Sequence, residues 1–163
     1  MKKFIFLIGI FFLSLNIKAQ TYLEDYVITG SAEYFKNTLL SNGFDQKDSD
    51  KILGNVFGEF AQIKIHANNL GNIDFISIVY RNLDNLKTKA LYNRIYNHLY
   101  NTEAWKMGNA IRELPKNLPY EGINKDYESK FRSNTYSLYS LSIITYQGMY
   151  NIHYLIIIHN YEN

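Results

Sequence analysis

The side chains of this sequence best suited to proton transfer are four histidines, namely His66, His98, His153 and His159. If residues 131–161 fold back at Gln147-Gly148, Ser142 lies directly opposite His153, which brings a base within reach of a hydroxyl nucleophile. The sequence provides neither an orienting carboxylate beside His153 nor an oxyanion-hole turn. We therefore assign no catalytic residue, and a small periplasmic hydrolase that uses His66 or His153 stays an alternative function.

Other kinds of site chemistry lack the residues that they need. The chain contains no cysteine, which excludes disulfides, thiolate metal sites and a catalytic thiol. No histidine spacing typical of a metal site occurs. Residues 45–50 include three aspartates but lack the glycine and the terminal glutamate of a calcium loop, so we expect a solvated polar loop there. No metal and no cofactor are predicted.

The first 19 residues have the three parts of a secretory signal peptide. Lys2 and Lys3 form a basic start, residues 4–15 form an uncharged apolar run, and Ala19 is the small residue before the cleavage position. The apolar run is shorter than the roughly 20 residues of a membrane-spanning helix. We expect an exported, periplasmic or secreted protein with residues 20–163 as a single domain and no stable membrane anchor after signal removal.

Removal of the signal peptide changes the charge balance. This segment holds three lysines and no acidic residue, so 14 of the 17 basic residues remain against 15 acidic residues. The formal charge of the remaining chain is then −1 rather than +2. Because nucleic-acid binding needs a clustered basic footprint, no nucleic-acid partner is expected.

Residues 131–161 predict a long β-hairpin. β-Branched and aromatic residues dominate both arms, and Gly148 suits a tight turn between them. With a two-residue turn at Gln147-Gly148, one face is nearly all apolar and carries the pairs Ile143–Ile152, Leu141–Tyr154, Tyr139–Ile156 and Ser137–Ile158. The opposite face mixes polar and apolar side chains, so only the first face is typical of a core.

A second hairpin is predicted around a loop at residues 69–72, with Asn68 opposite Ile73. Its apolar face carries the pairs Ile65–Ile76, Ile63–Ile78 and Ala61–Tyr80, and its mixed face carries Phe60–Arg81, Gln62–Val79, Lys64–Ser77 and His66–Phe75. Since both hairpins divide their side chains in the same way, we expect one sheet that helices cover on one side only.

Two helices are predicted to supply that cover. The first spans about residues 32–42, with Ser31 as its N-cap and Gly43 directly after its end. The second begins after Asp84 or Asn85, and its apolar stripe consists of Leu91, Ile95 and Leu99. A row of tyrosines runs beside that stripe, and we expect their hydroxyls to reach water at the edge of the core: Tyr92, Tyr96 and Tyr100.

The remaining elements are weaker. Tyr26–Ile28 is predicted as a strand before the first helix, and residues 106–130 are predicted to be irregular because two prolines and two glycines interrupt them. Residues 110–114 could form one helical turn there. The fold class is therefore α+β, a two-layer sandwich of order (β)-α-β-β-α-β-β with a mainly antiparallel sheet.

Part of the sequence resembles small exported bacterial proteins of uncharacterised function. The residues that carry the resemblance are Gly30-Ser31-Ala32-Glu33-Tyr34-Phe35, Leu39, Gly43-Phe44 and Gly58-Glu59-Phe60, and it covers residues 30–105. The helix-then-hairpin order is also similar to secreted β-lactamase-inhibitor proteins, which bind an enzyme across a concave sheet. Those proteins carry disulfides and a longer sheet, so the similarity implies the fold type alone.

The pattern favours an exported, non-enzymatic binding module that uses the open face of its sheet to contact a protein or another envelope partner. Apolar and aromatic residues interleaved with polar ones suit the centre of an interface. The predicted binding residues are Phe60, Phe75, Val79, Leu138, Ile144, Leu155 and Ile157. A structural homodimer with no ligand is the other alternative, in which a second copy or residues 106–130 cover this face.

Overall fold

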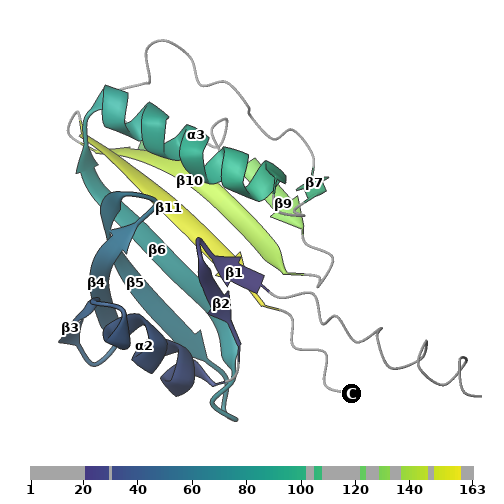
Figure 1. Ribbon diagram of the computed structural model, residues 1–163. Helices are drawn as coiled ribbons and strands as arrows, with labels where there is room; N and C mark the ends of the chain where they lie inside the picture. The colour runs from purple at the N-terminus through teal and green to yellow at the C-terminus, as the bar shows by residue number, and fades with distance from the viewer. Residues whose placement is uncertain are drawn as a thin grey trace, which may run out of the picture.

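The computed structural model describes residues 21–29, 31–101, 105–107, 122–123, 129–132, 137–146 and 149–158. These residues form an α+β fold with a large antiparallel sheet and the helices α2 (Ala32–Ser41) and α3 (Asn85–Asn101) (Figure 1). The predicted signal peptide at residues 1–19 and the predicted helical turn at residues 110–114 lie outside the described residues.

The described strands form a two-stranded and a nine-stranded sheet. The small sheet pairs β1 (Thr21–Leu23) with β2 (Tyr26–Ile28). The large sheet contains β3 (Asp45–Asp48), β4 (Lys51–Val56), β5 (Glu59–Ala67), β6 (Ile73–Leu83), β7 (Trp105–Met107), β8 (Gly122–Ile123), β9 (Ser129–Arg132), β10 (Leu138–Tyr146) and β11 (Met149–Ile157). Its order is β3-β4-β5-β6-β11-β10-β9-β7, and β8 pairs with part of β10.

The C-terminal hairpin has the predicted register. β10 and β11 place Ile143 opposite Ile152, Leu141 opposite Tyr154, and Ser142 opposite His153. Strand β11 also pairs with β6, so the two hairpins lie side by side in one sheet (Figure 1). The turn at residues 147–148 lies outside the described residues.

The other predicted hairpin is confirmed over most of its length. Strands β5 and β6 pair Ile63 with Ile78 and His66 with Phe75, as the alternation predicts. The predicted pairing of Asn68 with Ile73 is wrong, because a register shift after His66 places Ala67 opposite Ile73. Asn68 instead organises the loop, since its Oδ1 accepts hydrogen bonds from the backbone of Leu70 and Asn72.

Residues 45–50 differ from their prediction as a loop. Asp45–Asp48 forms the edge strand β3, which pairs with β4, and only Ser49 and Asp50 remain in the turn. All side chains of β3 are exposed, so the strand depends on backbone pairing and leaves no periodic pattern in the sequence. Charged side chains on an edge strand also discourage pairing with another chain.

Residues 106–130 are not wholly irregular. β8 lies inside this segment, and β7 and β9 overlap its two ends. Strand β9 pairs with β10 and with β7, which extends the large sheet beyond the C-terminal hairpin. Short strands of this kind are defined by backbone hydrogen bonds to a neighbouring strand. They are too short to show an alternating side-chain pattern in the sequence.

The caps that end helix α2 are those expected. The Ser31 hydroxyl accepts a hydrogen bond from the backbone amide of Tyr34, and Gly43 follows the helix with a φ of +87°. Phe44 then folds back, and its amide donates to the Leu39 carbonyl. The Phe44 ring lies over Gly54 of β4, where a Cβ would come within 2.1 Å of the ring. Gly54 is thus needed for this close packing.

Helix α3 is capped by Asp84, whose carboxylate accepts from the Lys87 amide. The prediction that its tyrosine hydroxyls reach water is wrong for two of the three. Tyr92 and Tyr96 are buried, and the Tyr92 hydroxyl is 2.6 Å from the Ser129 hydroxyl of β9. Only Tyr100 is exposed, at 51%. Strand β9, which the sequence did not predict, brings the polar partner of Tyr92 into the interior.

The turn between β4 and β5 is held by two other parts of the fold. Phe57 and Gly58 have φ values of +52° and +74°, as a tight hairpin turn requires. The Phe57 amide donates to Glu24 of the β1–β2 turn over 2.7 Å, and the Arg94 guanidinium of α3 donates to the Phe57 carbonyl. The buried Phe57 ring also contacts the ring edge of His98. This turn therefore connects β1, β2 and α3.

One hydrophobic core joins the two helices, the small sheet and the central strands of the large sheet. Helix α3 packs against β11 and helix α2 against β5. Burial alternates along the strands, as in β11, where Ile152, Tyr154 and Ile156 are buried and His153 and Leu155 are half-buried. One side of the sheet thus forms the core, and the side chains on its other side remain in partial contact with solvent.

Candidate binding face of the sheet

The partly exposed side of the sheet is called the mixed face here. It consists of the positions that alternate with the core: Gln62, Lys64 and His66 on β5; Phe75, Ser77 and Val79 on β6; Asn151, His153, Leu155 and Ile157 on β11; and Leu138, Ser140, Ser142 and Ile144 on β10. All fourteen are half-buried. Strand pairing aligns these side chains in rows that cross the sheet.

The most apolar row lies near the C-terminal end of β11. Its members are paired from β5 to β9 in the order His66, Phe75, Ile157, Leu138 and Arg132. The His66 and Phe75 rings stack with centroids 3.9 Å apart and planes 15° apart. The row is therefore a continuous aromatic and aliphatic strip that ends in an exposed arginine.

The neighbouring rows are more polar. One pairs Lys64, Ser77, Leu155, Ser140 and Lys130, and the next pairs Leu53, Gln62, Val79, His153 and Ser142. Leu155 and Val79 are thus apolar positions among hydroxyl, amide and basic groups. Such interleaving is common in protein interfaces, where polar groups surround an apolar centre.

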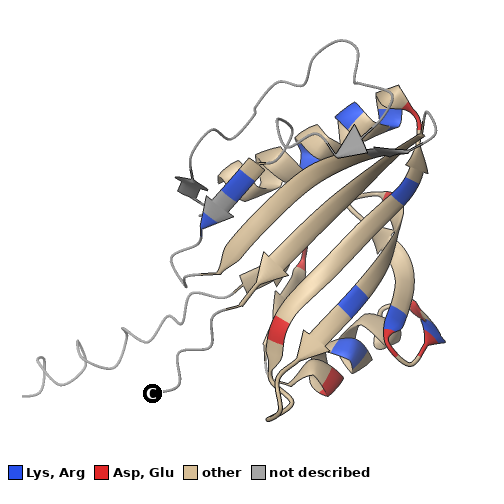
Figure 2. Ribbon diagram, turned by 180° about the vertical axis from the view of Figure 1, so that it is seen from behind, with Lys and Arg blue, Asp and Glu red and all other residues tan. Residues whose placement is uncertain are grey.

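Basic side chains lie on and around the mixed face. Lys130 and Arg132 of β9 are exposed at the margin beside β10, and Lys64 forms an ion pair of 2.8 Å with Asp50. Arg81 lies close enough to act on the pKa of His153. No Asp or Glu occupies any of the fourteen positions of the mixed face, and Figure 2 shows this side of the molecule with few charged residues along its strands.

The predicted binding residues fall into three groups. Phe75, Ile157 and Leu138 meet in the apolar row, and Val79 and Leu155 lie in the two rows beside it. Ile144 is farther along β10, opposite Asn151. Phe60 is apart from them near the β4–β5 turn, where it pairs with Asn55 and is 62% exposed. The structure therefore brings five of the seven residues together.

The histidines of the mixed face do not assemble a catalytic site among the described residues. Ser142 is opposite His153 as predicted, but the structure contains no hydrogen bond between them and no carboxylate in their row. Burial lowers the pKa of His153, and the nearby Arg81 lowers it further. A neutral imidazole is thereby favoured, but nothing in the row orients it toward the Ser142 hydroxyl.

Metal chemistry finds no support in the described part of the chain, where no group of three His, Asp or Glu side chains could hold an ion. Neither α2 nor α3, the helices that the structure describes, is long and apolar enough to cross a bilayer.

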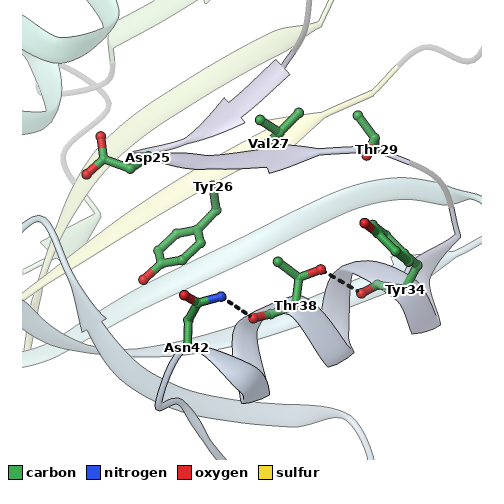
Figure 3. Close-up of a pocket in the computed structure, with 7 residues that line it drawn as sticks. All are labelled: Asp25, Tyr26, Val27, Thr29, Tyr34, Thr38 and Asn42. Carbon is green, nitrogen blue, oxygen red and sulfur yellow. Dashed lines mark hydrogen bonds between the residues drawn. The ribbon is translucent and has the colours of Figure 1, made fainter.

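Two features of the surface were not found from the sequence. The basic margin formed by Lys130 and Arg132 depends on β9, whose pairing with β10 no local pattern indicates. The second feature is a cleft of about 480 Å³ between β2 and α2 (Figure 3). Its signal in the sequence is the four-residue spacing of Tyr34, Thr38 and Asn42, which places these side chains along one face of α2.

Comparison with protein-family models, with curated proteins and with solved structures finds no match. The fold and the two surfaces are therefore the basis for assigning a function.

Proposed function

We propose that this chain is an exported, non-enzymatic binding module whose mixed face contacts a protein partner. The observation that carries the proposal is the apolar row of Phe75, Ile157 and Leu138, which crosses β6, β11 and β10 near one end of these strands and remains only half-buried. Apolar side chains that folding leaves partly in water gain further burial when a partner covers them.

The arrangement of the helices supports an accessible mixed face. Both helices contribute their buried residues to the core on the opposite side of the sheet, as expected for a two-layer sandwich covered on one side. In Figure 1 both helices lie on the near side of the strands, and Figure 2 views the sheet from its other side. The order of the described elements is longer than (β)-α-β-β-α-β-β, with four strands between α2 and α3 and five strands after α3.

The charges of the mixed face indicate the chemistry of the partner. Arg81, Lys130 and Arg132 are exposed around the apolar row, and acidic residues are absent from the fourteen positions of the face. A complementary surface would offer an apolar strip with acidic side chains at its margin. This favours a protein partner with an acidic rim over an identical copy, whose mixed face would bring like charges together.

The decisive experiment compares two leucine-to-lysine variants in capture of partners from an envelope extract. Leu155→Lys places a charge within the mixed face, and Leu70→Lys is the matched control because Leu70 is 71% exposed in the β5–β6 loop. Full burial of a leucine contributes about 1.5–3 kcal/mol, so the first variant should weaken binding by one to two powers of ten. The captured protein should cross-link to the mixed face, and high salt should weaken its binding.

Capture that survives Leu155→Lys and is lost in Leu70→Lys would place the interface elsewhere. His66→Ala and His153→Ala provide the separate test of the hydrolase alternative. If an activity is found that these substitutions abolish and Leu155→Lys does not, the binding module is wrong. If sedimentation shows a stable dimer of the purified chain that Leu155→Lys dissociates, the homodimer takes its place.

A further inference from the structure

The cleft between β2 and α2 lies away from the mixed face and has a distinct chemistry. On the helix side it is lined by Tyr34 and Thr38 of α2 and by its C-cap residue Asn42, which follow one another at four-residue spacing. These positions span eight residues, or about 12 Å of helix at roughly 1.5 Å per residue. Residues 25–27 and Thr29 line the other side, where Tyr26 extends toward α2 and the side chains of Asp25 and Val27 point away from the helix (Figure 3).

Aromatic rings stand at both ends of the cleft. Figure 3 shows Tyr26 extending from β2 toward α2, and Tyr34 extending from α2 toward β2. Tyr26 is fixed in place because its ring packs edge to face on Phe44, with centroids 5.5 Å apart. Tyr34 is 61% exposed, so its ring is available to a ligand. Each ring provides an apolar surface together with a hydroxyl that donates and accepts hydrogen bonds.

The polar groups between the rings are oriented before any ligand arrives. The Thr38 hydroxyl donates to the Tyr34 carbonyl over 3.0 Å, and the Asn42 amide donates to the Thr38 carbonyl over 2.8 Å. With its hydrogen engaged, the Thr38 oxygen acts as an acceptor, while Asn42 keeps its carbonyl oxygen and one N–H for a ligand. Such fixed groups reduce the entropy cost of binding.

The charge of the cleft restricts what it can bind. No Lys, Arg or His is among its lining residues, so phosphate and carboxylate ligands lack a counter-charge. Asp25 is the single ionisable carboxylate among them, too few oxygen ligands for a hard divalent cation. What remains is a neutral molecule with many O–H donors and apolar C–H faces.

We propose that this cleft binds a neutral saccharide of about two sugar rings. The ring faces of Tyr26 and Tyr34 would pack against the C–H faces of the sugars. The sugar hydroxyls would donate to the Thr38 hydroxyl and to the Asn42 carbonyl oxygen. This site is separate from the mixed face and does not rest on the proposed function, so the two proposals can fail independently.

The test is titration of the isotope-labelled chain with N,N′-diacetylchitobiose and maltose, observed by amide NMR. Inorganic phosphate and spermidine serve as charged comparison probes. At least one disaccharide should cause saturable shifts confined to residues 25–29 and 34–42. Tyr34→Ala should weaken its binding about tenfold, which corresponds to ~1.4 kcal/mol. Because Tyr34 is 61% exposed, this variant should keep its fold, which its own amide spectrum checks.

Asn37→Ala is the matched control for Asn42→Ala, since Asn37 is exposed on α2 but does not line the cleft. The first substitution should leave saccharide binding unchanged, and the second should weaken it. The proposal is overturned if neither disaccharide shifts the cleft signals, if spermidine or phosphate alone does so, or if Tyr34→Ala binds as tightly as the native chain.

Discussion

At the scale of single residues, the buried tyrosine hydroxyls differ in their partners. The Tyr92 hydroxyl is bonded to Ser129, whereas the hydroxyls of Tyr80 and Tyr154 have no hydrogen-bond partner among the described residues. Burial raises the pKa of Tyr92 to about 12, and it raises the pKa of Tyr154 well above its ordinary value. These phenols therefore stay protonated, and each buried hydroxyl costs free energy unless it is paired.

Phenylalanine substitutions should separate these cases. Tyr154→Phe removes an unpaired buried hydroxyl and should raise the free energy of unfolding by about 1 kcal/mol. Tyr92→Phe removes the hydrogen bond to Ser129 and should lower the free energy of unfolding by a similar amount. Urea denaturation of both variants provides the comparison. A loss of stability in Tyr154→Phe would mean that this hydroxyl has a partner in the folded protein.

Adjacent residues of β11 should report on the two sides of the sheet. Ile156 is fully buried and Leu155 is half-buried. Ile156→Ala should lower the free energy of unfolding by about 2–5 kcal/mol, as is usual for a large-to-small change in a core. Leu155→Ala should cost clearly less in the unbound chain. Chemical denaturation decides between this result and equal losses, which would show that both sides of the sheet are buried.

At the scale of secondary-structure elements, α3 meets the β1–β2 turn at a titratable site. Burial lowers the pKa of His98, while Glu24 and Asp25 act in the opposite direction. The folded protein thus resists protonation of His98, and the unfolded chain binds more protons once the pH falls below about 6.5. The free energy of unfolding is therefore highest above this pH. It decreases as the pH falls from about 6.5 toward the lower pKa that His98 has in the folded protein.

His98→Gln should remove part of this pH dependence. The stability of the native chain should decrease between about pH 7.5 and about pH 5, and the variant should show a smaller decrease. Urea midpoints measured at both pH values give the comparison. His153→Gln is a useful second variant, because burial and Arg81 lower the pKa of His153 as well. An identical pH dependence in native chain and His98→Gln would contradict the assignment.

The elements also show what could be predicted from the sequence. The predicted register of the hairpin at residues 138–157 is correct, because alternation and a glycine in the turn are local signals. Strand β3 was not predicted, because all four of its side chains are exposed and show no alternation of polar and apolar residues. The sequence does not indicate why position 54 is glycine, since only the folded chain brings the Phe44 ring over it. The pairs His66–Phe75 and Leu138–Ile157 could be predicted within their hairpins. Their junction in the apolar row, the basic margin and the cleft depend on contacts between elements distant in the sequence.

At the scale of the whole molecule, the start of the described chain contacts the residue that precedes β10. The Thr21 hydroxyl at the start of β1 is buried and lies 2.8 Å from the buried hydroxyl of Ser137, which precedes β10. Signal cleavage after Ala19 would leave a single residue before this buried position. Intact-mass and N-terminal analysis of native protein from envelope fractions should therefore find Gln20 or Thr21 as the first residue. A native protein that retains Met1 would contradict the export prediction.

The pairing of β6 with β11 has a consequence for how the protein acquires its structure. Synthesis produces β6 well before β11, and α3 and the strands β7, β8, β9 and β10 come between them. The backbone edge of β6 therefore stays unpaired in the nascent chain until β11 has been synthesised. The pairing of β6 with β11 is a contact of large sequence separation, which slows folding. Sheets with this topology fold slowly and expose an aggregation-prone edge in the interval. Chains truncated before Met149 should accordingly depend on chaperones to remain in solution.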